Sequence, residues 1–333
     1  MVNIDFRKLI SFGKGSYILS MPKTWIAKNN LKKGDMISIS DDGFELVLSA
    51  GRQDEKSEAK EIDIDAKGKD LEILKTEIVT SYLNGYDTIS IMFENNSKDV
   101  TRIKDVIRNL SGMEIMEQTS TRIVARNLIN LNEISISNII RRIDIITRAM
   151  VEDVILCCER QCTYDSINNR DVDVNRLYYL GYRYVKNAIK NPRIAKSTNA
   201  GLWQIHSDIL LLKKLERIAD RQKRIARYLC ETSLDRNTLA ELKKTHTEIS
   251  DAYNNAMKAY YNQDKKTAFE VEMTNKARTE SCNRILENYT HAKGMTKGKA
   301  ASENVVAVAK IIENMKATSI EARDIARIVL CYE

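Results

Sequence analysis

The second half of this sequence follows a helical pattern almost without interruption. From Ser135 onward, apolar residues recur three and four residues apart, which is the spacing of one face of an α-helix. The whole chain of 333 residues has only 2 Pro and 12 Gly, so little in it would break a long helix. The pattern predicts helices over residues 137–162, 171–191, 202–230, 238–262, 264–290 and 303–330, with breaks at 165–170, 191–192, 233–237 and 294–298.

The helical half also contains an internal repeat. Ile225-Ala226-Arg227 recurs as Ile325-Ala326-Arg327, at a spacing of 100 residues. Long helices are predicted to begin near residues 138 and 238, and again near 203 and 303, which agrees with that spacing. We therefore predict an all-α domain over residues 135–333, built as two tandem three-helix bundles at 137–230 and 238–330.

The third predicted helix carries two carboxylates on one face, because Glu216 and Asp220 stand one turn apart. The run Leu215-Glu216-Arg217-Ile218-Ala219-Asp220, followed by Ile225-Ala226, resembles the E/D-x-x-x-D motif of the PhoU family. The stretch 171–178, Asp-Val-Asp-Val-Asn-Arg-Leu-Tyr, resembles the second-helix segment of that family. Members are tandem three-helix bundles that regulate phosphate uptake and bind metal through such motifs. The resemblance covers roughly residues 135–333.

The resemblance implies a divalent or iron-type metal ion in the first bundle. The oxygen ligands would come from Glu216, Asp220, Asp171, Asp173 and Asn175. Asn175 stands where the family pattern has a carboxylate, so Asp171 or Asp173 would have to supply that charge.

An ordinary surface role for the same carboxylates stays open. Glu216 and Asp220 could simply form ion pairs on a solvated helix face with Lys213, Arg217 or Arg224.

The second bundle is predicted to lack the metal site. With a register of 100 residues, Glu216, Asp220, Asp171 and Asp173 correspond to Lys316, Ile320, Val271 and Met273. None of these four side chains offers an oxygen ligand.

The first fifty residues read as short strands, with an excess of basic residues at their front. Residues 1–33 contain seven lysines and arginines but one acid, Asp5. Strands are predicted at 7–12, 17–21, 36–40 and 44–48, with a turn at 13–16 and a short helix, 23–28, that opens after Pro22. So few apolar positions cannot close a core alone, and we expect partner strands from a second copy of the chain.

This front segment resembles the swapped-hairpin DNA-binding domain of the SpoVT/AbrB type, in the form found at the front of archaeal PhoU-like regulators. The resemblance rests on residues 13–25, Gly-Lys-Gly-Ser-Tyr-Ile-Leu-Ser-Met-Pro-Lys-Thr-Trp, and on Leu-Lys-Lys-Gly-Asp at 31–35. In that family two chains interleave their hairpins and present basic loops to DNA.

By position, the resemblance implies that the DNA contacts in this front domain are Arg7, Lys8, Lys14, Ser16 and Lys23. Lysine and arginine on short loops suit contacts to phosphates, and arginine can also read guanine edges. The alternative is that these are solvated charges on a module that only dimerises.

A polar linker is predicted at 51–60, followed by a small α+β domain at 61–130. Strands and helices alternate there in the order β-α-β-α-β-β, which predicts helices on one face of a sheet; a ferredoxin-like topology is one candidate.

Composition and motifs limit the function classes. The six cysteines are too few and too irregularly placed for a disulfide framework, so we expect reduced thiols packed between helices, three of them close together at Cys157, Cys158 and Cys162.

No run of about 18 apolar residues and no signal-peptide core is present, which predicts no membrane insertion and a cytoplasmic location. No nucleophile with a partnering base is visible, so we expect no enzyme activity.

The two resemblances in one chain together imply a DNA-binding transcriptional regulator of phosphate uptake and homeostasis. It would be a homodimer or a higher even oligomer formed through the N-terminal domain, with the helical half acting as a sensor or protein-docking module. The net charge of +7 permits a DNA partner without requiring one. The rival interpretation is a signalling adaptor that does not bind DNA and docks on the ATPase of a phosphate ABC transporter or on a sensor kinase.

Overall fold

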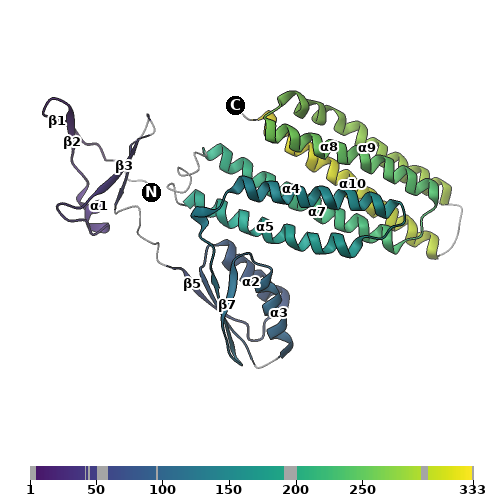
Figure 1. The fold of residues 1–333 in the computed structure, drawn as a ribbon, viewed down its shortest axis with the longest axis horizontal. Coiled ribbons are helices and arrows are strands. Elements are labelled where there is room, and N and C mark those ends of the chain that lie inside the picture. The colour runs from purple at the N-terminus through teal and green to yellow at the C-terminus, as the bar shows by residue number, and fades with distance from the viewer. Residues whose placement is uncertain are drawn as a thin grey trace. The chain divides into compact units, whose positions relative to one another are not determined.

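The protein is described here by a computed structural model, which covers residues 5–331 except 42, 44–45, 51–58, 95–96, 191–200 and 294–298. The chain forms two compact units, Met1–Ala59 and Lys60–Glu333 (Figure 1). Most of the predicted linker, and the predicted breaks at 191–192 and 294–298, lie outside the described residues.

The first unit consists of two hairpins and a short helix. Its elements are β1 (Leu9–Phe12), β2 (Ser16–Leu19), α1 (Lys23–Lys28), β3 (Ile37–Asp41) and β4 (Leu46–Ala50). β1 pairs antiparallel with β2, and β3 pairs antiparallel with β4. Gly13 has a φ of 67°, a left-handed conformation that glycine adopts at little cost, and it opens the tight turn between β1 and β2.

No described residue of this first unit is fully buried. Large apolar side chains that would normally form a core are exposed instead, among them Leu9 at 64%, Phe12 at 63%, Tyr17 at 68% and Met36 at 70%. The hairpins predicted from the sequence are therefore present, although the start of the predicted strand 44–48 lies outside the described residues. A single copy of the unit does not bury its own apolar surface.

The second unit begins with an α+β domain. Its elements are β5 (Glu61–Asp65), α2 (Leu71–Leu83), β6 (Thr88–Met92), α3 (Ser97–Arg108), β7 (Met113–Gln118) and β8 (Arg122–Asn127). The strands lie in the order β5-β6-β8-β7, and α2 and α3 cover one face of the sheet (Figure 1). Alternate strand residues such as Ile64, Ile91 and Ile123 pack against Ile78 and Ile107 of these helices.

The chain order of these strands and helices agrees with the prediction, but the ferredoxin-like topology is wrong. β5 and β6 are direct neighbours and run parallel, whereas a ferredoxin-like sheet has another strand between the two parallel strands of each βαβ unit. The sequence could indicate each element, but it could not indicate which strands pair.

Six long helices follow the short 3-10 turn Leu131–Glu133 in the described ranges. They are α4 (Ile136–Cys158), α5 (Tyr164–Lys190), α7 (Leu202–Glu231), α8 (Arg236–Asn262), α9 (Lys265–Lys293) and α10 (Lys299–Leu330). Side chains cap three of them: Ser135 accepts from the backbone N–H of Asn138, Asp235 from that of Thr238, and Asp264 from that of Thr267. None of the described helices combines the length and apolar character needed to cross a membrane.

The predicted break at 165–170 is wrong, because α5 already begins at Tyr164. Ile167 is completely buried in the bundle core, and its backbone N–H donates to the carbonyl of Thr163. Core packing of this side chain therefore stabilises the first turn of α5. The polar residues around Ile167 lie on the outer face of the helix, and they concealed this contact in the sequence.

The helices form two antiparallel groups that share one core. α4, α5 and α7 pack together, as do α8, α9 and α10, while α7 also lies along α10 and α4 along α8 (Figure 1). A continuous apolar cluster runs through both groups, with Leu215 and Ile218 of α7 and Ile311 and Ile325 of α10 in it.

A chain of polar side chains crosses this core. His246 of α8 contacts Gln222 of α7 at 2.8 Å, and the amide nitrogen of Gln222 donates to Thr318 of α10 at 3.2 Å. Because the Gln222 oxygen is then the acceptor, His246 donates through Nε2. Burial lowers the pKa of His246 to about 4, so the ring is neutral near pH 7.

One disulfide corrects the expectation of reduced thiols. Cys162, just after α4, is bonded to Cys230 near the end of α7, with a Cα–Cα distance of 5.5 Å. The separation of 68 residues hides this pairing in the sequence. Cys157, Cys158 and Cys282 are free and buried, as expected, and burial raises the pKa of the Cys158 thiol to about 12.

Arg183 of α5 fastens the α+β domain to the helices. Its side chain is 2% exposed, and Nη1 donates to the backbone carbonyls of Tyr82 and Tyr86 at 2.6 and 2.8 Å. Nη2 donates to Asp87 at 2.9 Å, and the guanidinium lies 4.9 Å from the centre of the Tyr82 ring. A buried cation whose two terminal nitrogens are paired in this way fixes the position of the domain on α5.

Replacing Arg183 by Met should therefore loosen the α+β domain. The change removes the hydrogen bonds of Arg183 to the carbonyls of Tyr82 and Tyr86 and its ion pair with Asp87, and we expect it to lower the free energy of unfolding in urea by about 3 kcal/mol. Arg126→Met, at an exposed arginine of β8, is the matched control and should change it by less than about 0.5 kcal/mol. Equal effects of the two substitutions would contradict this role of Arg183.

Candidate functional site

Three carboxylates of the first bundle lie together around one lysine. Asp171 near the start of α5 is 5% exposed, and Glu216 and Asp220 of α7 are partly buried; we call these three the acid cluster. Lys223 Nζ lies 2.6 Å from Asp171 Oδ2 and 3.2 Å from Asp220 Oδ1. Arg224 Nη2 lies 2.6 Å from the other oxygen of Asp220.

Lys223 is held in its charged form. Burial alone would lower its pKa, but the hydrogen bond to Asp171 and the negative charges of Asp171 and Asp220 raise the pKa above its ordinary value. Near neutral pH an ammonium group therefore stands between a carboxylate of α5 and one of α7.

Glu216 occupies a different position in the acid cluster. Within the described ranges, no hydrogen bond or ion pair joins it to another side chain. Burial raises the pKa of Glu216, and the charges of Asp220 and Asp171 raise it further. Burial also raises the pKa of Tyr178 to about 12, with the charge of Glu216 contributing. The Glu216 carboxyl is thus crowded by like charge and by phenol groups.

The remaining two predicted ligands behave differently from each other. The side-chain nitrogen of Asn175 donates to Asp171 at 3.2 Å, one turn along α5. Asp173 is exposed, because residues two positions apart on a helix point in nearly opposite directions. The structure therefore brings together four of the five predicted ligands and separates Asp173 from them.

The geometry does not favour a metal at this place. Among the described residues, no three His, Cys, Asp or Glu side chains are arranged so that they could hold a metal ion. The oxygens of Asp171 and Asp220 already receive hydrogen bonds from Lys223, Asn175 and Arg224. The metal site implied by the resemblance remains a prediction that only a binding measurement can test.

The ion pairs differ from those considered in the sequence. Arg224 does pair with Asp220, but Arg217 reaches Glu321 of α10 at 3.3 Å, and Lys213 is exposed. Lys223 was missed, although its position three residues after Asp220 is the signal that could have revealed it.

The second bundle has a different polar interior. Arg278 of α9 is 8% exposed and donates to Ser319 Oγ at 3.0 Å, Thr274 Oγ1 at 2.6 Å and the carbonyl of Val271 at 2.9 Å. Lys316, the counterpart of Glu216, donates to Asn283 at 2.8 Å. A guanidinium with neutral partners fills this interior.

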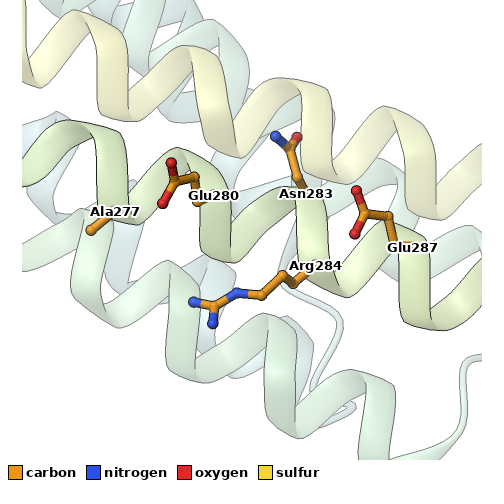
Figure 2. Close-up of a pocket in the computed structure, with 5 residues that line it drawn as sticks. All are labelled: Ala277, Glu280, Asn283, Arg284 and Glu287. Carbon is orange, nitrogen blue, oxygen red and sulfur yellow. The ribbon is translucent and has the colours of Figure 1, made fainter.

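A shallow hollow lies along α9, away from the acid cluster. Figure 2 shows that its lining side chains all come from that one helix; they belong to Ala277, Glu280, Asn283, Arg284 and Glu287. Its volume is about 380 Å³. It contains none of the predicted site residues, and a hollow bounded by one helix offers few convergent groups for a ligand.

The predicted DNA contacts are all exposed in the first unit. Lys14 lies in the turn between β1 and β2, and Ser16 Oγ donates to the carbonyl of Phe12 at 2.6 Å across that turn. Arg7, which forms an ion pair with Asp5, and Lys8 precede β1, so they lie at the opposite end of the hairpin. Lys23 begins α1, four residues after the end of β2. One protomer therefore displays its basic side chains at both ends of a short hairpin.

No protein-family model matches this chain, and no curated protein matches it in sequence. Among solved structures, it is similar to the crystal structure of PhoU from Pseudomonas aeruginosa, with a TM-score of 0.53 and 16% sequence identity. The similarity covers 59% of this chain and 93% of that one. The chain therefore contains a region with the PhoU fold, which confirms the predicted helical architecture; the SpoVT/AbrB-type assignment stays a prediction.

The acid cluster gives a direct test of its ion pair. Asp171→Asn removes the buried partner of Lys223 and should lower the free energy of unfolding by about 1–2 kcal/mol at pH 7. Asp173→Asn makes the same chemical change on the exposed side of α5 and should have an effect below about 0.5 kcal/mol. Urea denaturation followed by circular dichroism measures both, and a larger loss in the Asp173 variant would refute the arrangement.

Proposed function

We propose that this protein is a cytoplasmic, DNA-binding transcriptional regulator of phosphate homeostasis. The first unit would bind DNA as a dimer, and the PhoU-like helices would sense the state of the cell or dock a protein partner. The observation that carries the proposal is the combination, in one chain, of a region with the PhoU fold and a hairpin unit that has a basic front and no fully buried side chain among its described residues.

The need for a second copy follows from the burial of the first unit. Two-stranded hairpins are marginally stable in water unless further strands or helices cover their apolar face. Leu9 and Leu19 lie opposite each other in the β1–β2 register and are 64% and 46% exposed. An identical hairpin from another protomer would cover such surfaces symmetrically, which is the commonest way for soluble chains to assemble.

Light scattering on the full chain should accordingly show a dimer or a larger even assembly. Leu19→Asp places a charge in the surface that the second copy would cover and should shift the mass toward the monomer. Ile145→Asp is the matched control, because Ile145 is 61% exposed on α4 in the helical half. A monomeric wild-type chain would rule out this mode of assembly.

The DNA part of the proposal rests on charge and access. Seven lysines and arginines against one acid in residues 1–33 concentrate positive charge at the front of the unit, which would attract the phosphate backbone there. Lys14 sits at a turn where glycines on both sides add no side chain that would block close approach. Contacts of this kind hold a protein on DNA, while base contacts by residues such as Arg7 would add specificity.

Fluorescence anisotropy with promoter fragments of phosphate-transport operons tests this proposal. The double variant Arg7→Ala, Lys14→Ala should bind at least tenfold more weakly, with a flatter dependence of affinity on salt, since each lost phosphate contact removes about 0.9 from the logarithmic slope. Lys265→Ala, Lys266→Ala removes the same charge from exposed positions on α9 and serves as the control. Equal binding by all three proteins would contradict the assignment of the site.

The PhoU fold itself favours one alternative function. The helical half could act as a signalling adaptor on the ATPase of a phosphate transporter or on a sensor kinase, while the first unit only dimerises. A chain that binds no promoter fragment but co-purifies with either protein in a phosphate-dependent way would support the adaptor over the regulator.

A further inference from the structure

We propose that the ammonium group of Lys223 takes the place of a metal ion in the first bundle, so that a side chain of the protein itself neutralises carboxylates of the acid cluster. The inference concerns the helical half alone and holds whether or not the protein binds DNA.

The position of Lys223 on α7 carries the first part of the argument. Glu216, Asp220 and Lys223 follow one another at spacings of four and three residues, so they share one stripe of the helix. The stripe faces α5, because Lys223 Nζ reaches Asp171 Oδ2 at 2.6 Å while also lying 3.2 Å from Asp220 Oδ1. The ammonium thus bridges carboxylates of two helices, which is the place where a cation shared by those helices would bind.

The contacts of the carboxylate oxygens carry the second part. Asp171 Oδ2 accepts from both Lys223 and the amide nitrogen of Asn175, and the two oxygens of Asp220 face Lys223 and Arg224. A hard divalent cation requires about six oxygen ligands, each with a lone pair free for it. A metal ion would have to displace three donors to reach these oxygens, and Asn175 offers it a nitrogen donor rather than an oxygen.

Electrostatics of the acid cluster point the same way. Asp171 and Asp220 are balanced locally by Lys223 and Arg224, which leaves Glu216 as the remaining acidic group. A bound divalent ion would add two positive charges next to an ammonium about 3 Å from the same oxygens, and like charges at that separation repel strongly in a partly buried site.

The second bundle supports the inference by analogy within the same chain. Arg278 fills its polar interior with bonds to Ser319 and to the carbonyl of Val271, which is the counterpart of Asp171. Asn275, the counterpart of Asn175, accepts from Ser319 Oγ at 2.9 Å. In both repeats, therefore, a side-chain cation and this asparagine share one hydrogen-bond partner: Asp171 for Lys223 and Asn175, and Ser319 for Arg278 and Asn275.

The experiment measures metal dependence directly. Wild-type protein is dialysed against EDTA and then titrated with Mn²⁺ alone, with the melting temperature and the heat of binding as readouts. We expect no shift in melting temperature above about 1 °C in either step, and no saturable binding heat. Lys223→Met, which keeps the length of the side chain without its charge, should melt several degrees lower and should recover part of that loss on addition of Mn²⁺.

Lys213→Met is the matched control, because Lys213 is an exposed lysine of the same helix. It should neither lose stability nor gain a response to Mn²⁺. The double variant Lys223→Met, Asp171→Asn removes one charge of each sign; it should regain stability over the single variant and lose the Mn²⁺ response.

Three outcomes would overturn the proposal. The first is saturable Mn²⁺ binding by the wild-type chain that is lost in Glu216→Gln. The second is a wild-type melting temperature that falls after EDTA treatment. The third is a Lys223→Met variant that is as stable as wild type, or one that is less stable but gains no response to Mn²⁺. The first two outcomes do not involve the lysine variant, so they decide the question even if that variant does not fold.

Discussion

The helical half depends on α7, because this helix contacts α4, α5 and α10. Its apolar stripe, with Leu215 and Ile218, lies in the shared core, and its polar positions meet partners on both sides. Lys214 Nζ lies 2.7 Å from Glu321 and 2.6 Å from Asp324 of α10, while Lys223 serves α5 on another face. Long lysine side chains that lie along apolar surface with their ammonium groups paired let one helix satisfy several neighbours. The two bundles are joined by the ion pairs of Lys214 as well as by apolar packing.

Much of this architecture was predictable because long helices repeat their signal many times. A pattern that persists for about seven turns survives local exceptions, so every predicted long helix is present within a few residues of its expected bounds, except at the start of α5. The same periodicity placed Glu216 and Asp220 on one face and should also have separated Asp173 from Asp171. What it could not supply is pairing between distant segments, such as the disulfide of Cys162 and Cys230 or the adjacency of β5 and β6.

The acidic residues of the candidate site were predictable from the sequence, but the cations that neutralise them were not. The acids were visible as a motif, whereas the lysine that neutralises two of them is one of many in a chain with 53 lysines and arginines. Only the fold shows that Lys223 reaches across to Asp171 while Arg217 turns to α10. In the first unit, by contrast, the sequence indicated both the hairpins and the basic residues. The absence of buried side chains among its described residues also agrees with its sparse apolar pattern.

A tethered cation has physical consequences that a bound metal does not share. The ammonium group of a lysine is present in every molecule, whatever the metal concentration. It carries a single positive charge, so it neutralises two carboxylates only together with a neighbouring cation such as Arg224. α5 carries Asp171 near its start and Arg183 twelve residues later, which is about 18 Å along a rigid helix. The same helix thus holds the acid cluster at one end and the α+β domain at the other. If Lys223 fixes the first end, as proposed, a signal received by the helical half has to act through its packing or a protein partner rather than through metal occupancy of this cluster.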